Sequence, residues 1–291
     1  MRTYTLSDGS QIPAMGFGTY QVTSDRPIRQ AIDAGFRFFD TASLYETERI
    51  LGEAVRASKV PREAFVIETK LWIDEMDDPA AALDRSLRRL GMDYVDIYMI
   101  HWPRETGRMD EPWRERDIRT YHALEELVEK GKVRKLGLSN FLPHHLSNIL
   151  ENCTVRPVVD QMEIHPGYSQ EAATAFCRAN GVLSMAWSPF GRGELQAAAG
   201  NAIILGLAEK YGKSPQQINL RFLLQKGILP IPKASSEAHI RANLEAFDFE
   251  MSEEDVSLLT CMPQTTWLGE HPDFSIPKAK SNPANILTDV N

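Results

Sequence analysis

The chain has 291 residues, of which 43% are hydrophobic and 25% charged, a composition that excludes disordered, collagen-like and low-complexity proteins. Its 40 acidic residues outnumber its 32 basic ones and give a formal net charge of −8, so we expect no nucleic-acid partner. The length fits either two ordinary domains or one large barrel.

The spacing of the cysteines and the hydropathy of the chain exclude further classes of protein. Cys153, Cys177 and Cys261 are widely separated, which supports neither a disulfide framework nor a zinc site. Residues 1–11 are polar and do not resemble a secretory signal. The longest apolar runs have five to eight residues, whereas a membrane-spanning helix needs about 20. We therefore predict a soluble, cytoplasmic protein.

Short apolar runs rich in β-formers alternate along the chain with segments of helical periodicity. The predicted strands are residues 15–19, 35–40, 65–70, 94–101, 135–139, 158–161, 182–188 and 227–231. The predicted helices are residues 48–57, 79–90, 117–129, 144–150, 170–179, 202–210, 215–225 and 237–246.

This order predicts an α/β fold, a (β/α)8 TIM barrel, because repeated strand–helix units require parallel strands and eight of them close into a barrel. Residues 3–6 and 11–13 are expected to form an N-terminal β-hairpin that plugs the barrel bottom. The tail after Met262 is predicted to form an extended C-terminal loop. No linker or change in composition divides the chain, so we expect residues 1–291 to form a single domain.

Polar residues end several of the predicted strands, where a barrel of this type forms its active site. They are Asp40, Lys70, His101, Ser139 with Asn140, Gln161 and Ser188. Tyr45, five residues beyond Asp40, can reach the same rim. Each residue alone has an ordinary explanation, such as a helix cap for Asp40. Together, Asp40, Tyr45, Lys70 and His101 are better explained as one site.

The charges of this group suggest a tuned proton donor. A tyrosine has a pKa of about 10, and a neighbouring cationic lysine is expected to lower it by about 1–3 pH units. Asp40 would hold Lys70 in place, and a neutral His101 would orient a substrate oxygen. No nucleophile forms a relay with His101, and the pair His144 and His145 has no ligand partners in the sequence, so no metal is expected. The missing electron donor indicates a bound cofactor.

The sequence has no Rossmann fingerprint, because residues 16–18, Gly-Phe-Gly, match only the first half of the Gly-x-Gly-x-x-Gly motif. Residues 231–236 follow the last strand, where barrels commonly bind phosphate with a lysine and the next helix. Ser139, Asn140 and Gln161 suit a flat carboxamide, and Trp187 offers a stacking face. The alternative is that Lys233 is simply solvated and Trp187 belongs to the core.

The sequence resembles the aldo-keto reductases from Gly16 to about Phe249, and it is similar to the prokaryotic branch that includes diketogluconate and methylglyoxal reductases. The matching residues are 16–20, 39–42, Tyr45, Glu48, 51–52, 69–72, 100–103, 137–141, Gln161, Glu163, 165–166, 187–189 and 231–233. The order of these many matches, more than any one motif, carries the resemblance.

The resemblance implies a catalytic tetrad of Asp40, Tyr45, Lys70 and His101, in which Tyr45 protonates a carbonyl oxygen while NADPH gives hydride to the carbonyl carbon. It implies cofactor contacts from Gly18, Thr19, Tyr20, Asp40, Ser139, Asn140, Gln161, Trp187, Ser188, Phe190, Gly191, Lys233, Ser235, Ser236, His239 and Asn243. It implies a substrate pocket lined by Tyr20, Trp72, His101, Trp102 and Trp267.

Two departures from the family pattern concern the adenosine 2′-phosphate. Ala234 stands where a serine is usual, and His239 stands where an arginine is usual, with Arg241 as a candidate substitute. Losing a charge-assisted contact costs about 1.5–3 kcal/mol, or roughly ten- to a hundredfold in affinity. We expect NADP(H) to be preferred less strongly than usual, with NAD(H) also used.

The leading hypothesis is a monomeric NADPH-dependent reductase of small aldehydes and activated ketones. One alternative is an alcohol or sugar dehydrogenase working in the oxidative direction, and another is a cofactor-binding sensor or scaffold with little turnover. The charged segment 104–119 is predicted to be a solvated loop, with a lid or an anionic substrate site as the alternative. The sequence does not choose the substrate.

Overall fold

The protein is described by a computed structural model that covers residues 2–103, 113–191, 201–264 and 271–273. Eight parallel strands pair in chain order. They are β3 (Phe17–Gly18), β4 (Phe38–Asp40), β5 (Val66–Leu71), β6 (Val95–Ile100), β7 (Val133–Ser139), β8 (Val159–Glu163), β9 (Leu183–Trp187) and β10 (Leu229–Pro230). Gly16 N donates to Pro230 O and Gly18 N to Pro232 O, each at 3.0 Å, so the first strand also joins the last. The predicted barrel is confirmed.

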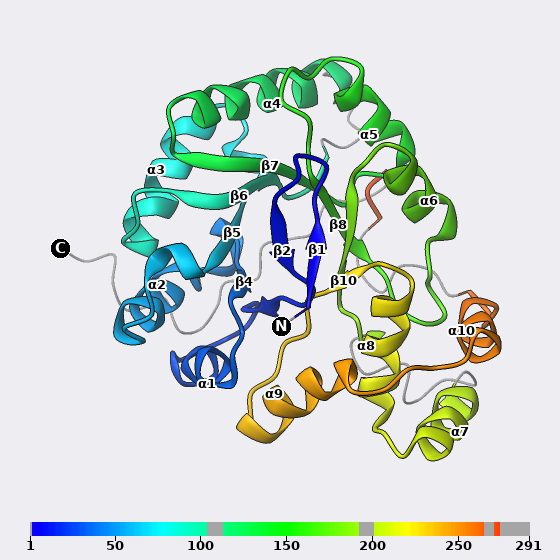
Figure 1. Ribbon diagram of the computed structural model, residues 1–291. Helices are drawn as coiled ribbons and strands as arrows, with labels where there is room; N and C mark the ends of the chain where they lie inside the picture. The colour runs from blue at the N-terminus through cyan, green and yellow to red at the C-terminus, as the bar shows by residue number, and fades with distance from the viewer. Residues whose placement is uncertain (1, 104–112, 192–200, 265–270, 274–291) are drawn as a thin grey trace.

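Helices surround this sheet (Figure 1). They are α1 (Arg26–Ala34), α2 (Glu48–Ala57), α3 (Pro79–Leu90), α4 (Trp113–Glu129), α5 (Pro143–Leu150), α6 (Glu171–Ala179), α7 (Asn201–Tyr211), α8 (Pro215–Gln225), α9 (Glu237–Leu244) and α10 (Glu253–Thr260). The bounds of α2, α3 and α8 are those predicted. For α3 and α8 the cause is local, because Asp78 and Ser214 cap them and proline opens each helix.

Two helices were not predicted, although each carries a local signal. Helix α1 buries Ile28, Ala31 and Ile32, which follow helical spacing, but no side chain caps its start. Ser252 caps the start of helix α10, where its side chain accepts a hydrogen bond from Asp255 N, and the first turn of the helix is acidic. It lies near the segment that the sequence suggested would be an irregular tail.

The charged segment 104–119 is not simply a solvated loop. Residues 104–112 lie outside the described residues, but residues 113–119 form the first turns of α4. Asp117 is fully buried there, and Arg116 pairs with Asp77 at 3.1 Å. The loop prediction is therefore wrong for residues 113–116, whereas residues 117–119 lie in the helix that was predicted over 117–129.

The hairpin of β1 (Thr3–Thr5) and β2 (Gln11–Pro13) plugs one end of the barrel, as predicted. Figure 1 shows it lying across the strands. Its Leu6 and Ile12 belong to the same buried cluster as apolar residues that fill the barrel interior, namely Phe38, Ile97, Met99, Val159, Met185, Leu229 and Ile231. The apolar half of the interior is therefore at the hairpin end.

The opposite end of the interior is polar. Side chains alternate along a strand, so Asp40 faces the same side of the sheet as Phe38, and Gln161 the same side as Val159. Lys70, in β5, and His101, just after β6, complete this polar layer. It lies at the carboxyl ends of the strands, where barrels place their sites.

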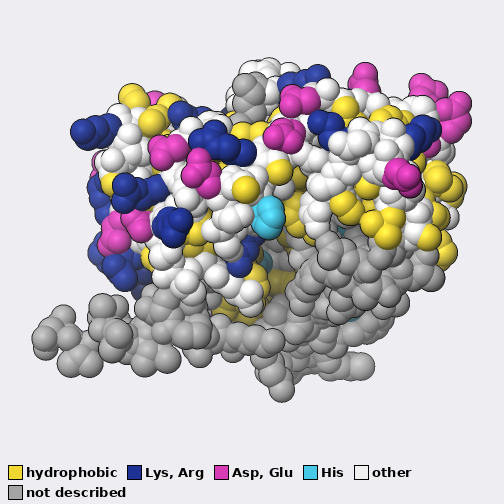
Figure 2. All heavy atoms as spheres, turned by 90° about the horizontal axis from the view of Figure 1, so that it is seen from below, with side chains coloured by type: hydrophobic (Ala, Val, Ile, Leu, Met, Phe, Trp, Pro, Cys, Tyr) yellow, Lys and Arg dark blue, Asp and Glu magenta, His cyan; other side chains and the backbone are white. Residues whose placement is uncertain are grey.

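The surface is mixed in charge on the face shown in Figure 2, where basic and acidic side chains are interspersed. Within the described ranges, no helix has the length and apolar character that crossing a bilayer would require.

Asp160 is an unusual acid on the outer side of β8. It is fully buried, its Oδ1 has no hydrogen-bond partner among the described residues, and the thiol of Cys177 lies 3.9 Å from its Oδ2. Burial raises the pKa of Asp160 to about 8, although a hydrogen bond from the Phe141 backbone opposes the change. The folded protein therefore keeps this proton at neutral pH.

We expect Asp160→Asn to flatten the pH dependence of stability. An unfolded aspartate has a pKa of about 3.9, so only the folded chain holds the proton between about pH 4 and pH 8, and the free energy of unfolding falls as pH rises through that window. At pH 8 the variant should be more stable than the wild type by several kcal/mol, because each pH unit of that window contributes about 1.4 kcal/mol. Urea unfolding at pH 5, 6.5 and 8 measures this, with the exposed Asp33→Asn as the control. Equal pH slopes for Asp160→Asn and wild type would contradict the prediction.

Candidate active site

The polar layer brings together the four residues predicted from strand ends. Asp40 ends β4, and Tyr45 ends the short 3-10 turn η1 (Ser43–Tyr45) that follows it. Lys70 Nζ forms a direct ion pair with Asp40 Oδ1. Tyr45 Oη lies 3.4 Å from His101 Nε2, and Lys70 Nζ lies 5.0 Å from the centre of the Tyr45 ring.

Buried threonines fix the chain between Asp40 and Tyr45. Thr19 donates to Asp40 O through both its backbone N, at 3.0 Å, and its hydroxyl, at 2.8 Å. The hydroxyls of Thr19 and Thr41 each lie 2.9 Å from that of Thr47. These bonds hold the turn that presents Tyr45 to the rim.

Lys70 remains a cation although its side chain is fully buried. Burial lowers the pKa of Lys70, but the negative groups around it, Asp40 first, outweigh burial and raise that pKa above its ordinary value. Lys70 Nζ also donates to Thr41 O at 3.0 Å. The predicted role of Asp40 in holding the lysine protonated agrees with this geometry.

The net effect on Tyr45 differs from the expectation. Burial raises the pKa of Tyr45 above its ordinary value, and the charge of Lys70 lowers it by less. The lysine acts in the predicted direction. However, the phenol is surrounded by protein instead of water, and this loss of hydration destabilises the phenolate more than the charge of Lys70 stabilises it. Tyr45 is therefore protonated at neutral pH, as a proton donor must be.

His101 is held neutral. Burial and the charge of Lys70 both keep the pKa of His101 well below its ordinary value. The ring packs edge-on against Trp72, with centroids 5.2 Å apart, and its Nδ1 has no partner among the described residues. A neutral imidazole at this place can orient an oxygen without competing with Tyr45 as the acid.

The three residues suggested for a carboxamide form one hydrogen-bonded network. Ser139 Oγ donates to Gln161 O at 3.0 Å, and Asn140 Nδ2 donates to His101 O at 3.0 Å. Trp187 Nε1 donates to Asn140 Oδ1 at 2.9 Å. Asn140 has a φ of 63°, in the left-handed region where asparagine is better tolerated than most residues. The network ties the carboxyl ends of β6 to β9 into one rim.

Glu68 is a site residue that sequence reasoning missed. Gln161 Nε2 donates both to Asp40 Oδ1, at 3.0 Å, and to Glu68 Oε1, at 2.7 Å. Glu68 Oε1 also lies 3.4 Å from Lys70 Nζ. The signal was present, because an acid two residues before Lys70 in an apolar strand faces the same side as that lysine.

The residues suggested for the cofactor phosphate surround the start of α9. Lys233, Ser235, Ser236 and His239 are exposed, and Ser236 Oγ caps the helix by accepting from His239 N at 3.3 Å. Arg241, the candidate substitute for the missing arginine, is already paired with Glu237 at 2.9 and 3.0 Å.

The remaining predicted contacts lie on the same side of the barrel or outside the described residues. The Tyr20 ring, 42% exposed, lies 4.9 Å from that of Tyr45, and Trp102 is buried. Gly18 and Gly191 are buried, and Ser188 and Phe190 are partly buried. Asn243 is buried and its Nδ2 has no partner among the described residues. Trp267 lies outside them.

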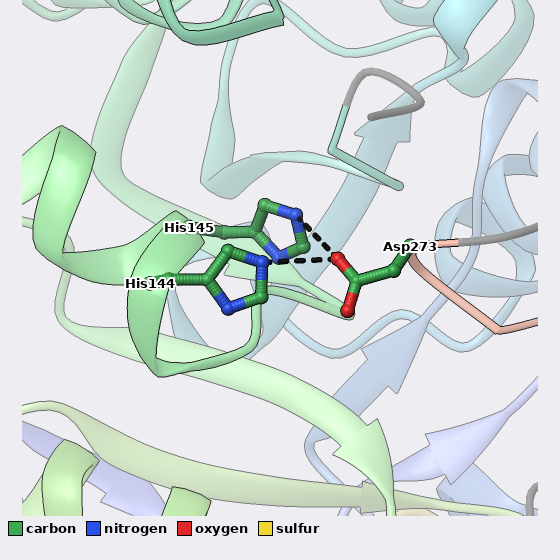
Figure 3. Close-up of side chains that lie close together, drawn as sticks. All are labelled: His144, His145 and Asp273. Carbon is green, nitrogen blue, oxygen red and sulfur yellow. Dashed lines mark hydrogen bonds and ion pairs between the residues drawn. The ribbon is translucent and has the colours of Figure 1, made fainter. Parts of the chain in front are cut away.

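His144 and His145, which seemed to lack partners in the sequence, meet Asp273 (Figure 3). Asp273 Oδ1 lies 2.9 Å from His144 Nε2 and 3.3 Å from His145 Nε2. The aspartate comes from a segment 129 positions after His144, so only the fold could show the contact.

The hydrogen bonds of His145 argue against a metal ion in this cluster. Leu142 N donates to His145 Nδ1 at 3.2 Å, so the neutral ring carries its own proton on Nε2, the atom that faces Asp273. A metal-binding histidine shows the reverse pattern, with its distal nitrogen donating to an acceptor. The hydrogen bond between His144 Nε2 and Asp273 Oδ1 instead joins α5 to residues 271–273.

Comparison with known proteins identifies the family. The model of the "Aldo/keto reductase family" matches residues 14–262. The chain belongs to the aldo/keto reductase family. The resemblance noted in the sequence is thus confirmed, and the protein is an oxidoreductase of that family.

Individual relatives agree with this assignment. A "9,11-endoperoxide prostaglandin H2 reductase" of Trypanosoma cruzi is 36% identical, over 94% of this chain and 95% of the relative. A "Glyoxal reductase" of Bacillus subtilis is 35% identical, over 93% and 96%. The crystal structure of an aldo-keto reductase complexed with NADPH is 32% identical, with a TM-score of 0.82, over 90% of this chain and 88% of that chain. The expected similarity to the prokaryotic branch that includes methylglyoxal reductases is confirmed, since a "Methylglyoxal reductase DkgA" of Escherichia coli is 33% identical, over 92% of this chain and 96% of the relative.

We expect His101 of this aldo-keto reductase to stay neutral across the range in which an ordinary histidine titrates. Its carbon-bound ring resonances, assigned by their loss in His101→Gln, should not shift between pH 5.5 and 8, because burial and Lys70 disfavour the imidazolium. The protein unfolded in urea is the control, because its histidine resonances are no longer shielded by burial and should shift across this range. A titration of His101 near pH 6.5 would show that the charge environment described above is wrong.

Proposed function

We propose that this protein reduces aldehydes and activated ketones to alcohols with NADPH, using Tyr45 as the general acid. The observation that carries the proposal is the position of the Tyr45 hydroxyl, 3.4 Å from a neutral His101 and beside a buried Lys70 that Asp40 holds protonated. The charge of Lys70 stabilises the phenolate that forms as Tyr45 gives up its proton, which is what a general acid requires.

The described residues fit the family cofactor. Asn243 Nδ2 is a buried amide donor that has no partner among the described residues, and Lys233 is an exposed cation beside the capped start of α9. Gly18 pairs with Asp40 from the neighbouring strand β3, Thr19 follows Gly18, and Gln161 reaches Asp40 from β8. We infer that the nicotinamide end binds near Ser139, Asn140, Gln161 and Trp187, and the phosphate end near Lys233, Ser235 and Ser236.

NADPH, when bound, supplies a hydride to the carbonyl carbon of the substrate. The protein's own part is proton transfer and orientation. His101 Nε2 positions the carbonyl oxygen, and Tyr45 Oη gives it a proton. Lys70 stabilises the phenolate that remains, and Asp40 keeps Lys70 charged and in place. Tyr20, Trp72 and Trp102 offer an aromatic wall around the reacting oxygen, which favours small and fairly apolar substrates.

The relatives support the direction and the substrate class. Two of them are named as reductases, one of glyoxal and one of a prostaglandin endoperoxide, and a structural neighbour holds NADPH.

A sensor that only binds cofactor would not need a buried Lys70 with its counter-ion beside Tyr45. An oxidative dehydrogenase would use the same residues in reverse, so the ratio of the two rates distinguishes it from a reductase.

Replacing Tyr45 with phenylalanine tests the assignment of the acid. Tyr45→Phe removes the donated proton but keeps the ring, so we expect carbonyl reduction to fall by about 10²–10⁴-fold. NADPH affinity, measured by quenching of tryptophan fluorescence, should change little. Oxidation of NADPH at 340 nm with a panel of aldehydes gives the rate.

The matched control is Tyr4→Phe, which removes a phenol at the hairpin end, where Tyr4 Oη donates to Leu224 O at 3.2 Å. It should retain full activity. More than a tenth of the wild-type rate in Tyr45→Phe would refute the role of Tyr45. A wild-type protein that binds NADPH but turns over none of the panel would favour the sensor alternative.

Cofactor preference is expected to depend on position 239. His239→Arg should raise the ratio of kcat/KM for NADPH over NADH about tenfold, because arginine gives phosphate a permanent charge and two hydrogen bonds. The rate with NADH should change little. The control His122→Arg adds the same charge on α4, away from α9. An unchanged ratio in His239→Arg would place the 2′-phosphate elsewhere.

A further inference from the structure

Glu68 is a buried acid in the middle of the proposed machinery. It lies in β5, two residues before Lys70, and its register partner in β4 is Asp40. Its side chain is fully buried. Oε1 accepts from Gln161 Nε2 at 2.7 Å and lies 3.4 Å from Lys70 Nζ, whereas Oε2 has no partner among the described residues.

The charges around Glu68 do not balance if every group takes its usual state. The ionisable groups that face this cluster, among the described residues, are Lys70 on β5, Asp40 on β4, Tyr45 on η1 and His101 after β6. Lys70 is the sole cation among them, because His101 and Tyr45 are neutral. Two ionised carboxylates would leave one buried negative charge uncompensated, which is strongly unfavourable.

A proton on Glu68 resolves the imbalance. Asp40 contacts Lys70 directly, while Glu68 stands farther from the cation, so Asp40 is the better-stabilised carboxylate. Glu68 also lies within hydrogen-bonding reach of Asp40, and a bond between two carboxyl groups needs a proton on one of them. Burial, with Asp40 nearby, raises the pKa of Glu68 well above its ordinary value although Lys70 opposes it.

We propose that Glu68 carries a proton at neutral pH and acts as a positioning residue that sets, through the charge balance around Lys70, how readily Tyr45 releases its own proton. This inference rests on the proposed function. While Glu68 is neutral, the positive charge of Lys70 is offset by Asp40 alone. When Glu68 ionises, a second negative charge acts on Tyr45 and makes its phenolate less stable.

The protonation of Glu68 is tested on the cofactor-free protein. An unfolded glutamate has a pKa of about 4.3, so the folded chain alone retains this proton above that pH, and stability is lost as pH rises toward the folded pKa. Glu68→Gln keeps the acceptor for Gln161 and cannot titrate. The urea midpoint of the variant should therefore fall less than that of the wild type between pH 5 and pH 9.

Equal slopes in that unfolding series would overturn the inference, and they would do so whatever the catalytic activity is. Glu68→Met, a neutral side chain of similar length, serves if Glu68→Gln does not fold. A wild type that turns over no substrate would defeat the proposed function while this unfolding comparison still decided where the proton lies.

The effect on Tyr45 is tested by alcohol oxidation with NADP⁺, using the alcohol that the reductase forms from its best aldehyde. This direction needs the Tyr45 phenolate, so the rate rises about tenfold per pH unit below the pKa of Tyr45. Wild type and Glu68→Gln should oxidise at equal rates near pH 6.5. At higher pH the wild-type rate should fall below that of the variant, by up to about tenfold, once Glu68 ionises and its negative charge opposes the Tyr45 phenolate.

Divergence with pH is the signature that a purely structural role would not give. Profiles that coincide up to pH 9.5, or that differ by the same factor at every pH, would overturn the tuning role. Glu163→Gln is the matched control, because Glu163 is equally buried on β8 but its neighbour is His165, at 3.2 Å. Its profile should run parallel to that of the wild type.

Discussion

Lys70 is a cation buried completely inside the barrel, and the need to compensate its charge determines the arrangement of the groups around it. A buried charge is tolerated only with a close counter-ion and satisfied hydrogen bonds. Asp40 supplies the counter-ion, and Thr41 O accepts a further hydrogen bond. Burial is the main cause of the neutral states of Tyr45 and His101. The field of Lys70 acts on both as well, since it opposes protonation of the histidine and favours loss of the tyrosine proton.

The barrel interior is divided into an apolar end and a polar end, and the buried charges gather at the polar end. Leu6 and Ile12 of the hairpin close the apolar end, so water has little access to the charges from below. Gln161 links the two parts of the rim, because its amide nitrogen bridges both carboxyl groups. The side chain that we propose for the cofactor amide is thus also part of the charge network around Lys70.

Local signals in the sequence were sufficient for much of the fold. Helices α3 and α8 begin where proline follows a capping side chain, and those signals act within one turn. The four residues of the candidate site were predictable because each lies at or just after a strand end, a place that a barrel turns into one rim. Glu68 was missed, although its spacing from Lys70 carried the information, because a single strand does not reveal that its inner face is the site.

The sequence by itself determined the barrel class and the residue types at the rim, because these follow from periodicity and the alternation of side chains, and its ordered motif matches indicated the family by resemblance. The tertiary structure alone decided which charges are compensated. The pKa of Tyr45 is raised because folding removes water from the phenol, a cost that residue spacing does not express. The contact between His145 and Asp273, and the excess of carboxyl groups over cations at Lys70, likewise exist only once distant segments are brought together in space.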